Sequence, residues 1–133
     1  MHTILSGELS IQLFCLAFLS ILFLQSGLDK VFNYKANKEW LTSHFAKSPL
    51  KNMVGLMIPM ITLLEVAAGL ISAVGIIQLL WTSATSIGLL GAQLSALSIL
   101  SLFFGQRLAQ DYAGAGALVG YFLVCLASIY FLL

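Results

Sequence analysis

The sequence predicts an all-α integral membrane protein: a bundle of four transmembrane helices with a short interfacial amphipathic helix between the first two. Of its 133 residues, 60% are hydrophobic and only 8% are charged, whereas a soluble domain has about 25% charged residues. The apolar residues form long unbroken blocks instead of the roughly ten-residue alternation of a membrane β-strand. Because backbone groups in lipid must be paired internally, we expect these blocks to be helices.

The first span is expected at about residues 9–28, because no ionisable side chain lies between Glu8 and Asp29. This interval has the roughly 20 residues that cross about 30 Å of hydrocarbon. A cleaved signal peptide is the alternative interpretation. No lysine or arginine precedes the block, its apolar region is longer than usual, and no small-residue cleavage site follows. We therefore expect the segment to be retained.

The one polar stretch of the chain follows this span and contains all five lysines. It predicts an amphipathic helix over residues 38–47, because Trp40, Leu41 and Phe45 recur at helical spacing opposite the lysines. Such a pattern is typical of a helix that lies on the membrane with its aromatic side chains in the headgroup layer. Pro49 should end this helix, because the residue before a proline avoids the helical conformation.

Three further spans are expected at about residues 53–80, 87–104 and 112–133, and all four form a single domain. The third span should end where Gly105-Gln106-Arg107 leaves the membrane. Asp111 is placed to cap the first turn of the last span.

The basic residues predict an orientation. All five lysines lie in the first connection, and the only arginine, Arg107, lies in the third. These two connections share one side of the membrane, whereas both termini share the other. The positive-inside rule then places the basic connections in the cytoplasm and both termini outside it.

Glu65 is the first candidate for a functional residue, because it falls near the middle of the second span. A carboxyl at that depth is costly in lipid, so it should face the bundle interior and be uncharged unless a cation or water reaches it. Ser20, Gln93 and Tyr121 lie at similar depth, and one hydrogen-bonded layer is predicted from these four residues. Two interpretations stay open: a structural clamp, and a ligand or proton site.

A second candidate site is a cluster of charged side chains at the cytoplasmic helix ends. Its members are Asp29, Lys30, Arg107 and Asp111. We expect an interfacial pair between Asp111 and Lys30, which by itself would contribute little stability. The cluster is either simply solvated or recognises a headgroup or a protein partner.

Small residues four positions apart predict close packing between the helices in lipid. The pairs are Gly69 and Ala73, Gly88 and Ala92, Gly91 and Ser95, and Gly116 and Gly120.

The sequence has no recognisable catalytic or metal-binding motif, such as HExxH or a Gly-rich phosphate loop. Cys15 and Cys125 lie inside apolar blocks and are interpreted as buried small side chains. His2 and His44 lie outside the spans and are expected to be solvated. The net charge of +1 gives no basic footprint for nucleic acid.

Three segments, in this order, resemble the DoxX family of small four-helix bacterial membrane proteins. Residues 23–32 resemble its small-Gly-x-x-Lys ending of the first helix, and residues 65–70 its glutamate followed four positions later by Gly-Leu. Residues 110–115 resemble the opening of the last helix in some members. The arginine common near the start of the family's first helix is missing. The resemblance implies a four-helix bundle in a bacterial inner membrane.

Two functions are expected. The first is a small non-catalytic membrane subunit or lipid-binding partner of a larger complex, because 133 residues leave no room for a catalytic domain. Its partners would be membrane lipids and other membrane subunits or a second copy. The second is implied by the resemblance: a quinone-linked oxidoreductase component with Glu65 as an intramembrane proton site. A transporter is less favoured, because the sequence shows no inverted repeat.

Overall fold

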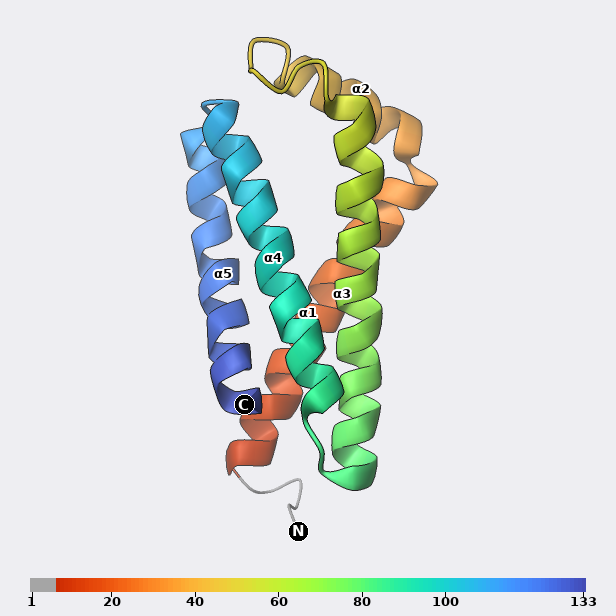
Figure 1. Cartoon of the computed structure of the whole chain (residues 1–133), viewed down its shortest axis with the longest axis vertical. Helices are drawn as coiled ribbons and strands as arrows, with labels where there is room; N and C mark the ends of the chain where they lie inside the picture. Colours follow the sequence, from red (N-terminus) through yellow and green to blue (C-terminus); the bar gives the residue numbers. More distant parts are fainter. Residues whose placement is uncertain (1–6) are drawn as a thin grey trace.

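The computed structural model describes residues 7–133, which form five helices and no strand (Figure 1). The helices are α1 (Gly7–Phe32), α2 (Tyr34–His44), α3 (Val54–Thr82), α4 (Ser86–Leu108) and α5 (Tyr112–Leu132). All but α2 are long and apolar enough to cross a membrane. The predicted all-α four-helix membrane bundle, with a short helix between its first two spans, is confirmed.

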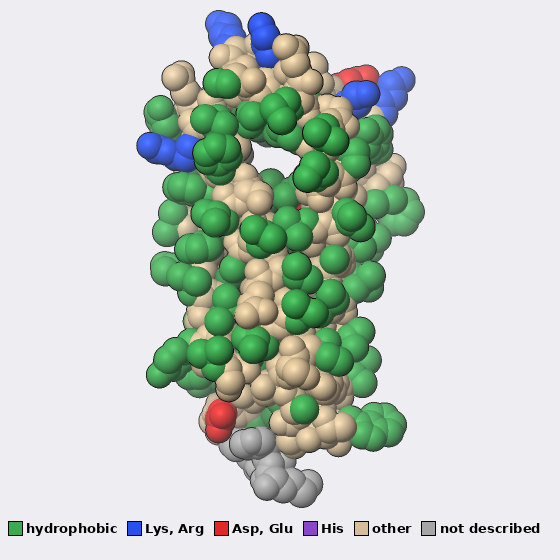
Figure 2. Space-filling view, viewed as in Figure 1, with side chains coloured by type: hydrophobic (Ala, Val, Ile, Leu, Met, Phe, Trp, Pro, Cys, Tyr) green, Lys and Arg blue, Asp and Glu red, His purple; other side chains and the backbone are tan. Residues whose placement is uncertain are grey.

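The helices pack in a simple order: α1 against α3, α3 against α4, and α4 against α5, with further contact between α5 and α1. The start of α1, the α3–α4 turn and the end of α5 lie at one end of the bundle (Figure 1). At the other end lie α2 and the α4–α5 turn, and the Lys and Arg side chains gather there (Figure 2).

Two connections differ from the sequence prediction. The helix α2 begins earlier than residue 38 and ends at His44, because Phe45 leaves the helical conformation with φ −97° and ψ 10°. The proline therefore lies in the following turns and does not end the helix. The helix α4 continues through Gly105, Gln106 and Arg107 to Leu108. The N–H of Ala109 still donates to the Gly105 carbonyl at 2.9 Å, so the chain leaves the helix one turn later than expected.

Glycines allow close contact between α3 and α4. A methyl group on Gly75 would lie 2.5 Å from the Cα of Gly88, and one on Gly91 would lie 2.8 Å from the backbone nitrogen of Ser72. Real side chains do not reach such distances, so the two backbones meet only because these positions are small.

The predicted small-residue pair in α5 has no such role. Gly116 and Gly120 are exposed, and a methyl group on either would meet no atom within 4 Å. The prediction of close packing is wrong for this pair, because α5 turns these glycines away from α4 and α1. The expected cap of α5 is confirmed: the N–H of Gly114 donates to Asp111 Oδ1 at 2.8 Å.

Four buried serines satisfy their hydroxyl groups within their own helices, whereas the buried hydroxyl of Ser72 has no hydrogen-bond partner among the described residues. Each of the four donates to the carbonyl four residues earlier, at 2.7–2.9 Å; the pairs are Ser20 to Leu16, Ser95 to Gly91, Ser98 to Leu94, and Ser128 to Val124. These hydroxyls therefore add polar atoms to the core without linking one helix to another.

Candidate functional site

An ion pair between α1 and α3 is the most deeply placed charged feature in the described part of the chain. Glu65 is 1% exposed, so the prediction that it faces inward is confirmed. Its Oε1 lies 2.9 Å from Nζ of Lys30, which is in the last turn of α1. A cation therefore reaches Glu65, which is the condition under which the sequence allowed a charged carboxyl at this depth.

Close packing between α1 and α3 positions this pair. A methyl group on Gly27 would lie 2.6 Å from the Val66 side chain, and one on Gly69 would lie 2.7 Å from the backbone nitrogen of Leu24. Val66 and Gly69 both lie within about one helical turn after Glu65 on α3, so these contacts hold the end of α1 close to it. The flexible stem of Lys30 then carries its ammonium to the carboxylate.

The predicted layer of Glu65, Ser20, Gln93 and Tyr121 does not form. Gln93 is exposed, and Tyr121 is 37% exposed with its ring 6.2 Å from that of Phe18. Ser20 donates to its own helix. Similar depth does not determine which way a helix is rotated, and in the described structure α5 makes no contact with α3. The expected hydrogen bonds from Glu65 to Gln93 or Tyr121 are therefore wrong.

The predicted interfacial charge cluster divides into separate contacts. Asp29 accepts a hydrogen bond from Asn33 Nδ2 at 2.8 Å, and Arg107 lies over the Tyr112 ring at 4.5 Å from its centroid. The expected pair between Lys30 and Asp111 is wrong, because Lys30 turns inward to Glu65 while Asp111 caps α5.

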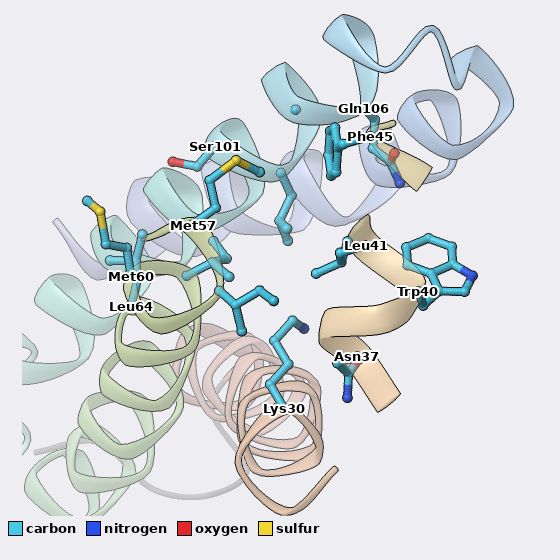
Figure 3. A pocket seen from close by; sticks show the side chains of 14 residues that line it. Lys30, Asn37, Trp40, Leu41, Phe45, Met57, Met60, Leu64, Ser101 and Gln106 are labelled. Carbon is cyan, nitrogen blue, oxygen red and sulfur yellow. The ribbon is translucent and has the colours of Figure 1, made fainter. Parts of the chain in front are cut away.

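A pocket of about 390 Å³ lies beside Lys30, between α2, α3 and α4 (Figure 3). Its lining is mainly apolar and includes Leu41, Met57, Ile61, Leu64 and Leu102. Polar atoms come from Asn37, Ser101 and Gln106, and Lys30 is the one charged side chain in the lining. Figure 2 shows an opening in the surface below the end that carries the Lys and Arg side chains.

The helix α2 covers this pocket and lines it with Asn37, Trp40 and Leu41. Phe45 is 5% exposed and packs with Leu41 against Val54 and Ile58 of α3. Phe45 therefore packs on the apolar upper end of α3 rather than in the headgroup layer, and the position of α2 at the membrane surface stays a prediction. Trp40 remains largely exposed and also lines the pocket.

His44 attaches α2 to the end of α4. Its Nε2 lies 2.7 Å from Gln106 Oε1 and 3.5 Å from Asp111 Oδ2, and its ring stacks on Trp40 with the centroids 4.6 Å apart. Because an amide oxygen only accepts, Nε2 carries the hydrogen of the shorter contact. The expectation that His44 is solvated is therefore wrong, whereas His2 lies outside the described residues.

Neither cysteine is in a disulfide; Cys15 is partly exposed and Cys125 is buried. Within residues 7–133, no three His, Cys, Asp or Glu side chains are grouped as metal ligands would be. The site is thus an apolar pocket with an ion pair beside it and a small helix above it.

The sequence contains a signal for the partner of Glu65 that matching residues by depth does not detect. Lys30 stands at the end of a span, where a long cationic side chain reaches several ångströms along the helix. A buried carboxyl requires a partner, and such a lysine is a better one than a neutral amide. The pocket has no comparable signal, because it depends on the angles between helices.

Comparison with known proteins returns no match among family models, curated proteins or solved structures. The resemblance to the DoxX family stays a prediction from the three segments.

Proposed function

We propose that the protein is a small non-catalytic membrane protein that binds a membrane lipid, acting as a DoxX-like partner or subunit of a larger inner-membrane complex. One observation carries the proposal: the pocket of about 390 Å³ beneath α2. Pockets of this size, mainly apolar with a few polar groups, are typical of small-molecule sites.

The position of the pocket favours a lipid over a water-soluble ligand. Met60 of α3 and Ser101 of α4 both line the pocket and are exposed on the outer surface of the bundle. A molecule can therefore reach the pocket from the acyl-chain region, between these two helices. Its chain would contact Met57, Ile61 and Leu64, with its headgroup near Lys30.

A second candidate function is a quinone-linked oxidoreductase component. It is favoured by the carboxyl of Glu65, a group able to take up or release a proton, one side chain away from the pocket through Lys30. A quinone also combines an apolar tail with a polar ring. Bound quinone with redox turnover in the purified protein would support this function over the first.

The test is to identify molecules that remain bound after purification in a mild detergent, by native mass spectrometry and lipid extraction. We expect a bound lipid in the unchanged protein and little in the variant Ile61→Phe/Leu64→Phe, which fills the pocket. Leu63→Phe is the matched control, because Leu63 is 73% exposed on the same helix. Equal lipid retention in the filled variant would contradict the proposal.

The proposed orientation has both termini outside the cytoplasm. It is supported by the Lys and Arg side chains, which gather at the end opposite to the start of α1 and the end of α5. A reporter active only in the cytoplasm, fused after Leu133, is expected to be inactive. The same reporter inserted after Lys47 should be active, and the reverse pattern would overturn the orientation.

A further inference from the structure

The positive charge that Lys30 brings to the pocket is balanced by the negative charge of Glu65. Lys30 is the one charged side chain in the lining, and Glu65, which is 1% exposed, lies 2.9 Å behind it. Lys30 lines the pocket and reaches toward it (Figure 3), whereas the buried Glu65 is not part of the lining. A ligand would therefore meet a cation whose counter-charge is fixed within the protein.

The ammonium retains hydrogen-bonding capacity. A lysine ammonium has three N–H donors, and Glu65 is its partner among the described residues. The lining also includes the side-chain amides of Asn37 and Gln106. The NH₂ group of Asn37 already donates to the Asn33 carbonyl at 3.0 Å and to Asp29. The amide oxygen of Gln106 is engaged by His44, which leaves its NH₂ group as a donor. Lys30 and Gln106 thus provide hydrogen-bond donors to the pocket, and the Lys30–Glu65 pair carries no net charge.

We propose that the pocket selects an uncharged amphiphile whose headgroup presents carbonyl and hydroxyl oxygens, of the monoacylglycerol type, over an amphiphile with an anionic headgroup. This inference rests on the proposed lipid-binding function. An anionic headgroup would place a second negative charge next to Glu65 around one cation, in surroundings of low dielectric constant where repulsion is strong. A cationic headgroup would face the ammonium itself. An ester or hydroxyl oxygen accepts from Lys30 and leaves the ion pair intact.

The ion pair therefore determines headgroup selectivity, and a single substitution should reverse it. Glu65→Gln keeps the shape of the side chain and removes its charge. Lys30 then carries an unbalanced positive charge beside the pocket, which an anionic headgroup would neutralise. Affinity for the anionic lipid should rise and the preference of the pocket should change sign.

The two tryptophans allow a direct measurement. Trp40 lines the pocket, whereas Trp81 is 85% exposed at the opposite end of α3. In a Trp81→Phe protein, Trp40 is the one tryptophan that reports binding. The probes are a monoacylglycerol and a lysophosphatidate with the same dibromostearoyl chain, in nanodiscs of unbrominated lipid. Bromine quenches indole fluorescence at contact, and the two probes differ only in the phosphate.

We expect half-maximal quenching by the monoacylglycerol at about a tenth of the lysophosphatidate concentration, and about a tenfold preference in the opposite direction in Glu65→Gln. Equal quenching by both probes in the unchanged protein would contradict the proposed selectivity but would still support a lipid site. A preference unchanged by Glu65→Gln would overturn the role of the ion pair. Quenching that persists in Ile61→Phe/Leu64→Phe would instead contradict the lipid site itself. The comparison of the two probes in the unchanged protein tests the selectivity even if the Glu65→Gln variant folds poorly.

Discussion

The helices α3 and α4 are in backbone contact at one end and stand apart at the other (Figure 1). Near their connecting turn, Gly75 meets Gly88 and Gly91 meets Ser72, with no room for another carbon atom. At the other end, Met57 and Ile61 of α3 face Leu102 of α4 across the pocket. The same pair of helices thus includes a closed half and an open half.

This difference shows how one helical hairpin serves both stability and binding. Small residues in the closed half let the two backbones approach, which holds α3 and α4 together at this end. Larger side chains keep the open half apart, and α2 covers the space that remains. Glu65 lies between the two halves along α3, so its pair with Lys30 connects the packed region to the pocket.

The largest expected effect comes from breaking this connection. Lys30→Met leaves Glu65 buried with no cation, and removing one partner of a buried pair costs about 3 kcal/mol of unfolding free energy. Unfolding in mixed micelles would measure the loss. The double variant Lys30→Met/Glu65→Met should recover most of it, because no charge is then buried.

The partner substitutions complete this test. Glu65→Gln should be tolerated, whereas Glu65→Leu should cost roughly 1–3 kcal/mol by leaving the ammonium unpaired. A Lys30→Met protein as stable as the unchanged one would show that the pair has no structural role.

A smaller effect is expected from the closed half. Gly75→Ala places a methyl group against the backbone of Gly88, and the resulting separation of α3 and α4 should cost about 2 kcal/mol. Gly120→Ala is the matched control, because its methyl group meets no atom within 4 Å and alanine favours the helix. If both variants unfold alike in the micelle assay, backbone contact is not what holds the closed half together.

The smallest effect is expected in the open half. His44→Ala removes the contacts to Gln106 and Trp40 and should weaken the attachment of α2 by about 1 kcal/mol. In a Trp81→Phe background, aqueous iodide should then quench Trp40 more strongly, with little change in global unfolding. Thr42→Ala is the control, because Thr42 is exposed and donates to the Lys38 carbonyl of its own helix. Unchanged access of iodide to Trp40 would show that α2 is held by Leu41 and Phe45 alone.

The spans could be predicted from the sequence because each reflects a local property, the length of an apolar block between charges. The inward position of Glu65 followed from the cost of a carboxyl in lipid. Its partner could not be found by matching depth, because rotation about each helix axis turns Gln93 outward while Ser95 and Ser98 face inward. The role of α2 depended on an apolar surface at the end of α3, which exists only in the assembled bundle.

Most buried serines reach the bilayer with their hydroxyl groups already satisfied, since each bonds to its own helix. Glu65 is different, because its partner belongs to another helix. Because α1 precedes α3 in the chain, Lys30 is synthesised before Glu65 and can be at the membrane when α3 inserts. We therefore expect the presence of α1 to lower the free-energy cost of placing the Glu65 carboxyl in the membrane with α3. A circular permutation that places α1 last in the chain would remove this advantage and leave α3 to enter the lipid alone.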